Sequence, residues 1–297
     1  MKISRRDFLR YCGISAAALG LNGTDLMKLY EALATTSGPK VLWLVGSACT
    51  GCSVSFLNHI SPKSPASAAD LLINNVNLTY HPSLMATAGQ EAAAIAEQAA
   101  TDGGYILVVE GGVPTAFGGG ACLAWTYNGA DVTFQQAVTK LAAKASLIVC
   151  AGNCSAFGGI PAAYPNETGV KSVKDVTGKT TINIAGCPPH PDWLVWAISQ
   201  ILVKNTITVD SLGRPTYLFS KSVHDSCPRK GKSPARTYAQ EGGCLKELGC
   251  QGPKTKANCS ILKWNNGVSW CIDANAPCIG CTNPDFPAAN LMKGGKV

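Results

Sequence analysis

The distribution of cysteine residues constrains the fold of this chain more than any other feature. The sequence has 297 residues and 14 cysteines, and its cysteines crowd between Cys227 and Cys281 after a sparse first two thirds. Many cysteines in a small secreted domain indicate a disulfide scaffold. This chain is long, and 46% of its residues are hydrophobic, so it can build a large apolar core without disulfides. Its cysteines are therefore candidate metal ligands.

The N-terminus predicts the compartment. Arg5 and Arg6 precede Phe8, Leu9 and a short apolar stretch, which is the pattern of a twin-arginine export signal. We interpret residues 1–34 as this signal, and an amphipathic N-terminal helix is the alternative. The twin-arginine route exports folded proteins, so metal can be bound before the chain reaches the oxidising periplasm.

No stretch of the sequence reaches the roughly 20 apolar residues that a membrane-spanning helix needs. We therefore expect a periplasmic chain without a transmembrane span of its own. We also expect no nucleic-acid partner.

Residues 40–204 alternate between strand-like and helix-like segments. Apolar runs such as KVLWLVG (40–46) and SLIVCAG (146–152) are typical of buried strands, and helical segments such as GQEAAAIAEQAA (89–100) separate them. Asp192 is the expected N-cap of the last helix in this stretch. Strands that alternate with helices predict an α/β fold with a doubly wound parallel sheet.

The pattern changes after about residue 205. Helical periodicity fades, and Gly, Pro, Asn and Cys become frequent. We expect two domains, 35–204 with the sheet and 205–297 with a loop-rich region that is ordered by cofactors.

Four cysteines of the first domain follow predicted strands: Cys49, Cys52, Cys154 and Cys187. The loops at the carboxyl ends of parallel strands converge on one crevice. Four thiolates at one place are what a cubane iron–sulfur cluster needs.

The second domain supplies eight more candidate ligands: His224, Cys227, Cys244, Cys250, Cys259, Cys271, Cys278 and Cys281. Iron in such clusters takes soft thiolates, and imidazole can replace a thiolate. Zinc is the competing metal, but a zinc ribbon pairs two C-x-x-C motifs at short spacing. Thiol exchange at Cys49 and Cys52 would leave the other ten ligands unexplained.

The ordered motifs CTGCS, CSAFGGIPAA, GCPPHPDW, VHDSCPR, GCLKELGCQGP and APCIGCTNPDFP resemble the small subunit of nickel–iron hydrogenases. The resemblance covers nearly the whole chain after the signal. It implies a flavodoxin-like domain, a C-terminal iron–sulfur cluster domain and an electron relay. The implied partners are a nickel–iron or nickel–iron–selenium large subunit, which splits dihydrogen, and a periplasmic cytochrome or membrane-bound electron acceptor.

The resemblance also assigns the ligands to three clusters. A proximal group lies next to the large subunit, a distal group lies near the surface, and a medial group belongs between them. The proximal group is Cys49, Cys52, Cys154 and Cys187; the distal group is His224, Cys227, Cys244 and Cys250; the medial group is Cys259, Cys271, Cys278 and Cys281. Cys12 leaves with the signal, and we interpret Cys122 and Cys150 as ordinary buried thiols.

The chain departs from the family pattern beside its first motif. Many relatives have acidic residues where this chain has Ala48 and Val54. Glu110 matches the family pattern at the end of a predicted strand, either near the proximal cluster or as a structural carboxylate.

The medial motif also differs. Cys271 follows Trp270, where many relatives have a proline, and this pattern is familiar from the nickel–iron–selenium branch. With Cys271 included, the resemblance implies three 4Fe–4S clusters.

We therefore expect the electron-transfer small subunit of a periplasmic uptake hydrogenase. The alternatives are another iron–sulfur subunit of a respiratory complex and a disulfide-bonded periplasmic protein without redox function. Between Lys221 and Lys263 there are nine Lys or Arg and three Asp or Glu, which favours either a solvated surface or a docking site for an acidic electron acceptor.

Overall fold

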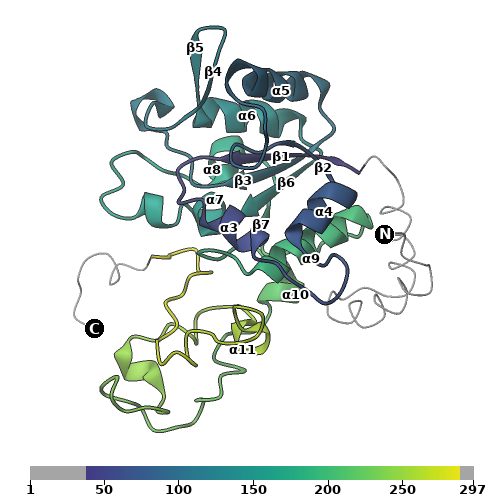
Figure 1. The fold of residues 1–297 in the computed structure, drawn as a ribbon. Coiled ribbons are helices and arrows are strands. Elements are labelled where there is room, and N and C mark those ends of the chain that lie inside the picture. Colours follow the sequence, from purple (N-terminus) through teal and green to yellow (C-terminus); the bar gives the residue numbers. More distant parts are fainter. Residues whose placement is uncertain (1–37, 288–297) are drawn as a thin grey trace, which may run out of the picture.

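A five-stranded parallel sheet forms the centre of the computed structural model, which describes residues 38–287 (Figure 1). The strand order is β2-β1-β3-β6-β7. The strands are β1 (Lys40–Val45), β2 (Asn77–Tyr80), β3 (Ile106–Glu110), β6 (Leu147–Ala151) and β7 (Ile182–Ile184). This order is the flavodoxin-like one, and the predicted fold class is confirmed. The predicted export signal and Cys12 lie outside the described residues.

Helices cover both faces of the sheet because successive strand residues point to opposite sides. Val41 and Trp43 of β1 belong to one apolar cluster, whereas Leu42 and Leu44 belong to the other. The first face packs against α3 (Gly51–Leu57), α4 (Ala68–Asn74) and α9 (Pro191–Leu202). The second face packs against α5 (Gly89–Asp102), α6 (Phe134–Lys144) and α8 (Val173–Thr177).

The prediction that Asp192 caps α9 is wrong. The N-cap is His190, whose ring nitrogen accepts the backbone N–H of Asp192. Pro191 occupies the first helical position, where its missing N–H costs nothing, and this shifts the cap toward the N-terminus. Asp192 instead places its negative charge in the first turn of the helix, where the helix dipole favours it.

A small hairpin, β4 (Leu123–Tyr127) and β5 (Ala130–Thr133), extends from the second face of the sheet. Its turn is Asn128-Gly129, and both residues have positive φ, at 51° and 79°. This is the strongest short-range hairpin signal in a sequence.

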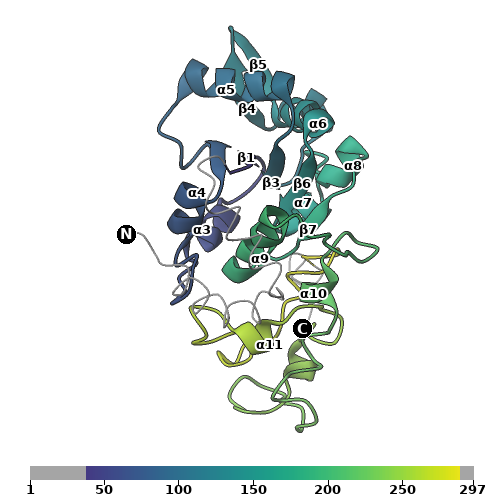
Figure 2. The same cartoon turned by 90° about the vertical axis from the view of Figure 1, so that its right-hand side faces the viewer.

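The cysteine-rich part of the chain lies beyond the carboxyl ends of the sheet strands in both views (Figures 1 and 2). Its few regular elements are α10 (Thr216–Phe219), η3 (Leu245–Leu248) and α11 (Cys259–Leu262). The remaining short elements, α7 (Asn153–Phe157), η1 (Ala116–Gly119) and η2 (Ile160–Ala162), belong to loops of the sheet part. The first apolar cluster continues into the cysteine-rich part through residues such as Leu218, Phe219 and Val223.

Candidate metal centres

The proximal group comes together at the carboxyl edge of the sheet. Cys49 follows β1 and Cys52 lies in α3, while Cys154 lies in α7 after β6 and Cys187 follows β7. Burial raises the pKa of Cys154 to about 12, with a further contribution from the Cys187 thiolate. The pKa of Cys52 rises well above its usual value through burial, Glu110 and the other three thiolates. All four thiols therefore interact electrostatically.

One glycine permits this convergence. Gly152 has a φ of +93°, and a Cβ built there would lie 2.4 Å from Cys52 Sγ. A side chain at this position would therefore displace a proximal thiol. Thr50 lies between the two cysteines of the first motif in the left-handed region, with a φ of 61°. Such strained backbone is typical of functional loops.

Glu110 is a hydrogen-bonded carboxylate beneath the proximal group and is fully buried. The backbone N–H groups of Cys52 and Ser53 donate to its two oxygens at 3.0 and 3.1 Å. The Ser53 hydroxyl and Trp43 Nε1 also donate to it. The carboxylate thus binds the N-terminal turn of α3 and fixes the position of Cys52, which makes Glu110 a structural carboxylate.

His81 extends this network. The backbone N–H of Ser83 donates to its Nδ1 at 3.1 Å, so the proton of a neutral ring lies on Nε2 and is donated to Ser53 Oγ. Burial lowers the pKa of His81 to about 4, and the ring is neutral at neutral pH. The Ser53 hydroxyl can therefore give its own proton to Glu110.

The medial group also comes together, within the cysteine-rich part. Burial raises the pKa of Cys259 to about 12, with contributions from the thiolates of Cys278 and Cys271. The pKa of Cys281 is raised by burial and by all three of these thiolates. Cys271 is thus a member of the group, although it is its exposed member.

The distal group is held by loop contacts. The backbone N–H of His224 donates to the Gly252 carbonyl at 3.2 Å, and the Gly252 N–H points to Cys250 Sγ at 3.4 Å. The N–H of Cys227 donates to the His224 carbonyl at 3.2 Å. Cys244 has no direct contact of this kind with the other three among the described residues, and it is linked to them through Arg229.

Arg229 is a residue that the sequence analysis missed. Its guanidinium donates to the Gly243 carbonyl at 3.2 Å, to Asn275 Oδ1 at 2.6 Å and to the Ile272 carbonyl at 2.8 Å. It therefore joins the loop after Cys227 to the loops that carry Cys244 and Cys271. Its position two residues after a candidate ligand was the available signal, but nothing in the sequence identified its partners.

The three groups follow one another in space. The backbone of Cys187, in the proximal group, lies close enough to the Cys281 thiol, in the medial group, to lower its pKa against the raising effect of burial. The thiolate of Cys250, in the distal group, raises the pKa values of Cys271 and Cys278 in the medial group. The medial group therefore lies between the other two.

The donor chemistry of these groups fits iron–sulfur clusters. Each group offers soft sulfur ligands, and a buried set of thiolates needs positive charge nearby to stay deprotonated. Ser260, the neighbour of Cys259, has a buried hydroxyl without a hydrogen-bond partner among the described residues. In residues 38–287 no three His, Cys, Asp or Glu side chains are arranged around a single metal ion. A cluster does not require that arrangement, because each thiolate binds a different iron atom.

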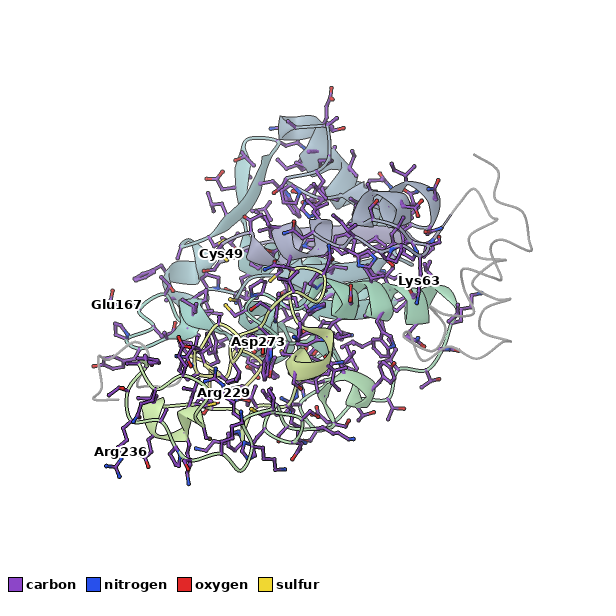
Figure 3. The ribbon with its side chains drawn as sticks, turned by 60° about the horizontal axis from the view of Figure 1, so that its bottom comes forward. Cys49, Lys63, Glu167, Arg229, Arg236 and Asp273 are labelled. Carbon is purple, nitrogen blue, oxygen red and sulfur yellow. The ribbon has the colours of Figure 1, made fainter. Side chains whose placement is uncertain are left out.

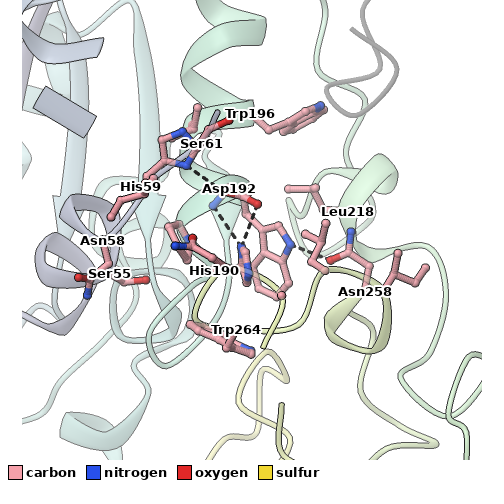
Figure 4. A pocket seen from close by; sticks show the side chains of 18 of the residues that line it. Ser55, Asn58, His59, Ser61, His190, Asp192, Trp196, Leu218, Asn258 and Trp264 are labelled. Atoms are coloured by element: carbon pink, nitrogen blue, oxygen red, sulfur yellow. Dashed lines mark hydrogen bonds and ion pairs between the residues drawn. The ribbon is translucent and has the colours of Figure 1, made fainter. Parts of the chain in front are cut away.

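A cleft of about 1400 Å³ lies beside the proximal group, at the junction of the sheet part and the cysteine-rich part (Figure 4). Gly51 and Pro188, each next to a proximal cysteine, contribute to its wall. His59 Nδ1 lies 2.9 Å from Asp192 Oδ1 on the side of the sheet part, and Trp264 lines the opposite side. The cleft neighbours the thiol groups and contains none of their cysteines.

The two cysteines outside the groups differ. Cys150 is fully buried in β6, and its pKa is raised by burial to about 12, as expected for an ordinary core thiol. Cys122 is only partly buried, so the prediction of a buried thiol is wrong for this residue. It lies at the edge of the core, just before β4.

Comparisons with known proteins identify the family to which this chain belongs. A family model described as "NADH ubiquinone oxidoreductase, 20 Kd subunit" matches residues 49–201. A second model, which describes the C-terminal part of the NiFe/NiFeSe hydrogenase small subunit, matches residues 219–292. The periplasmic [NiFeSe] hydrogenase small subunit of Desulfomicrobium baculatum is 39% identical, over 97% of each chain. The chain belongs to the small-subunit family of nickel–iron hydrogenases.

Other members of the hydrogenase small-subunit family are similarly close. The periplasmic [NiFe] hydrogenase small subunit of Solidesulfovibrio fructosivorans is 40% identical, over 96% of this chain and 90% of that one. A solved structure of the Ni-Fe-Se hydrogenase from Desulfomicrobium baculatum matches with a TM-score of 0.78 at 40% identity, over 84% of this chain and 96% of that one.

As a hydrogenase small subunit, the chain pairs with a large subunit, carries iron–sulfur clusters and takes part in electron transfer. The family model of its first part is named for a respiratory enzyme, whereas the model of residues 219–292 is specific to hydrogenases. No helix in the described part of the chain has the length and apolar character needed to cross a membrane.

Proposed function

We propose that this chain is the electron relay of a periplasmic uptake hydrogenase. It would receive electrons from dihydrogen oxidation in a large subunit and pass them to an external acceptor. Relatives named periplasmic and uptake hydrogenase small subunits support this assignment, as does the sequence pattern of a twin-arginine signal. The domain boundary near residue 205 belongs to the same proposal.

In this proposal the proximal, medial and distal groups each hold one 4Fe–4S cluster, with the ligands assigned above. Each bound cluster would accept and release one electron at a time. The spatial order of the groups carries the proposal, because the pKa values of medial cysteines respond to Cys250 of the distal group and to Cys187 of the proximal group. The protein sets the spacing of the three groups, and Glu110 and Arg229 fix the loops that carry them.

Cys271 supports a four-iron cluster at the medial site. A proline in this position offers no ligand, so a fourth iron atom has nothing to hold it, whereas a thiolate supplies that ligand. The negative charge of a Cys271 thiolate raises the pKa values of the other three medial cysteines. The shared proximity of four thiols argues against a free surface cysteine.

The test is to purify the chain with whatever polypeptide accompanies it, under anaerobic conditions. We expect a nickel-containing large subunit, about twelve iron atoms in this chain and bleaching of its visible absorbance under dihydrogen. The chain purified alone should show no dihydrogen uptake with a dye acceptor. A colourless protein, or robust turnover without a second polypeptide, would contradict the proposal.

A further inference from the structure

Positive charge is concentrated around the distal group. Residues 38–204 contain eight Lys or Arg and nine Asp or Glu, so the sheet part is nearly neutral. Residues 221–263 contain nine Lys or Arg and only three Asp or Glu. Within residues 38–287 the excess is thus confined to one part, the part that supplies all four distal ligands.

Two short backbone ladders place lysines next to these ligands. The N–H of Ala257 donates to the Lys221 carbonyl at 3.1 Å, and the N–H of Val223 donates to the Thr255 carbonyl at 2.7 Å. This antiparallel pairing places Lys256 opposite Ser222 and Lys221 opposite Ala257, so both lysines lie at the base of the His224 loop. The ladder requires buried residues such as Val223, but the lysines themselves are exposed.

The second ladder lies at Cys244. The N–H of Cys244 donates to the Ser233 carbonyl at 3.0 Å, and the N–H of Ala235 donates back to the Cys244 carbonyl at 2.8 Å. It brings Lys232 beside Cys244, and Lys246 lies two residues after Cys244 in η3. Lysines therefore accompany the distal ligands on both ladders.

Five exposed lysines form what we call the distal lysine group. They are Lys221, Lys232, Lys246, Lys254 and Lys256. None of them makes an ion pair with another residue in the range 38–287. Arg229 is different, because its guanidinium is used within the fold, and Arg236 faces Glu247 at 3.7 Å. Figure 3 shows Arg236 at the outer edge of this part and Arg229 closer to the loops.

We propose that the distal lysine group is the docking surface for an electron-acceptor protein with an acidic face. This inference rests on the proposed relay, because it takes the distal group as the point of electron exit. Unpaired surface charges around such a point steer an oppositely charged partner into the productive orientation, and the steering weakens with salt. An anionic membrane would also attract lysines, but lysines placed around redox ligands favour a redox partner. Each dihydrogen yields two protons and two electrons, so it reduces two molecules of a one-electron acceptor.

The experiment uses the complete enzyme with its large subunit. The rate of dihydrogen-dependent reduction is measured for flavodoxin, an acidic redox protein, and for mitochondrial cytochrome c, a basic one, at increasing ionic strength. We expect the flavodoxin rate to fall about tenfold or more from low to high salt, and the cytochrome c rate to stay flat or rise. The same salt response for both acceptors, or a flat flavodoxin rate, would overturn the proposal.

A matched pair of variants locates the surface. Lys232→Glu with Lys254→Glu should lower the flavodoxin rate at low salt about tenfold, whereas Lys144→Glu with Lys179→Glu, the same charge change on the sheet part, should lower it less than twofold. Equal losses in the two variants would refute the assignment. The assignment would also be refuted if the enzyme sedimented strongly with anionic phosphatidylserine vesicles and reduced the two acceptors at equal rates.

Cluster reduction under dihydrogen, followed by electron paramagnetic resonance without any acceptor, separates the two proposals. If the clusters are not reduced, the relay itself is wrong. If they are reduced normally in all variants and the acceptors are not distinguished, only the docking proposal fails.

Discussion

The sheet part and the cysteine-rich part of this molecule are stabilised in different ways. Residues 40–202 contain all seven strands and the long helices, and apolar clusters cover both faces of the main sheet. Residues 205–287 contain only short elements, such as α10, η3 and α11, and carry two of the three candidate cluster groups. The first part can order itself by burying apolar surface. The second has little regular structure of its own, and we expect it to depend on the ligand groups that its loops surround, as small metal domains do.

Iron starvation should separate the two parts most strongly. In protein produced without iron, backbone amides of residues 205–287 should exchange about 100-fold faster than in the iron-loaded protein, whereas those of β1, β3 and β6 should change little. Hydrogen exchange with mass spectrometry measures both at once. A uniform increase in the amide exchange rate over the whole chain would show that the two parts unfold together. It would contradict the view that they are stabilised in different ways.

Cys271→Pro tests how far the cysteine-rich part depends on each ligand. We expect the medial cluster to change from a four-iron to a three-iron form, because one thiolate is lost. The measurement is the electron paramagnetic resonance spectrum of the anaerobically oxidised enzyme, which should gain a three-iron signal of about one spin per chain. Cys122→Ala is the control and should leave the spectrum unchanged. A three-iron signal already present in the unmodified protein would disprove the four-iron assignment.

Glu110→Gln tests whether the sheet part positions the proximal loop without help from the cluster. The amide keeps the shape but loses the charge that accepts hydrogen bonds from Cys52 and Ser53. We expect the free energy of unfolding to fall by about 2 kcal/mol, against less than about 0.5 kcal/mol for Glu167→Gln at the protein surface. Denaturant titration of the iron-loaded protein measures both variants. Equal stabilities would mean that the buried carboxylate does not hold the loop.

Arg229→Lys tests for cofactor-independent stabilisation within the cysteine-rich part. Lysine keeps the charge but lacks the planar fork that reaches three acceptors in two loops. A loss of about 1–2 kcal/mol is expected, together with faster amide exchange around residues 243 and 272. Arg236→Lys, at a side chain that is 83% exposed, is the control and should change neither quantity. If both variants behave alike, the cofactors alone order these loops.

The difference between the sheet part and the cysteine-rich part also explains which features the sequence could predict. Apolar runs such as KVLWLVG and SLIVCAG identified strands of the main sheet, here β1 and β6. The parallel topology then predicted that Cys154 and Cys187 lie together although they are distant in sequence. In the structure the four proximal thiols lie close enough to raise one another's pKa values. The β4–β5 hairpin was not predicted, although Asn128-Gly129 was a readable signal.

Other features could not be predicted because they depend on tertiary contacts. Arg229 has acceptors 14 to 46 residues away, and no local pattern identifies such partners. The network around Glu110 likewise joins residues that are 57 to 67 positions apart. The cap of α9 was misplaced for a local reason, because Pro191 starts the helix before Asp192.

The contact between Cys187 and Cys281 also has a consequence for biosynthesis. Along the chain the distal residues 224–250 come before the medial residues 259–281. The polypeptide therefore forms the distal loops first and then returns to form the medial group, which lies between the distal and proximal groups. Cys281, the last cysteine of the sequence to be synthesised, therefore completes the medial group. A chain that ended before Cys278 would keep all proximal and distal ligands but would lose two of the four medial ligands that lie between them.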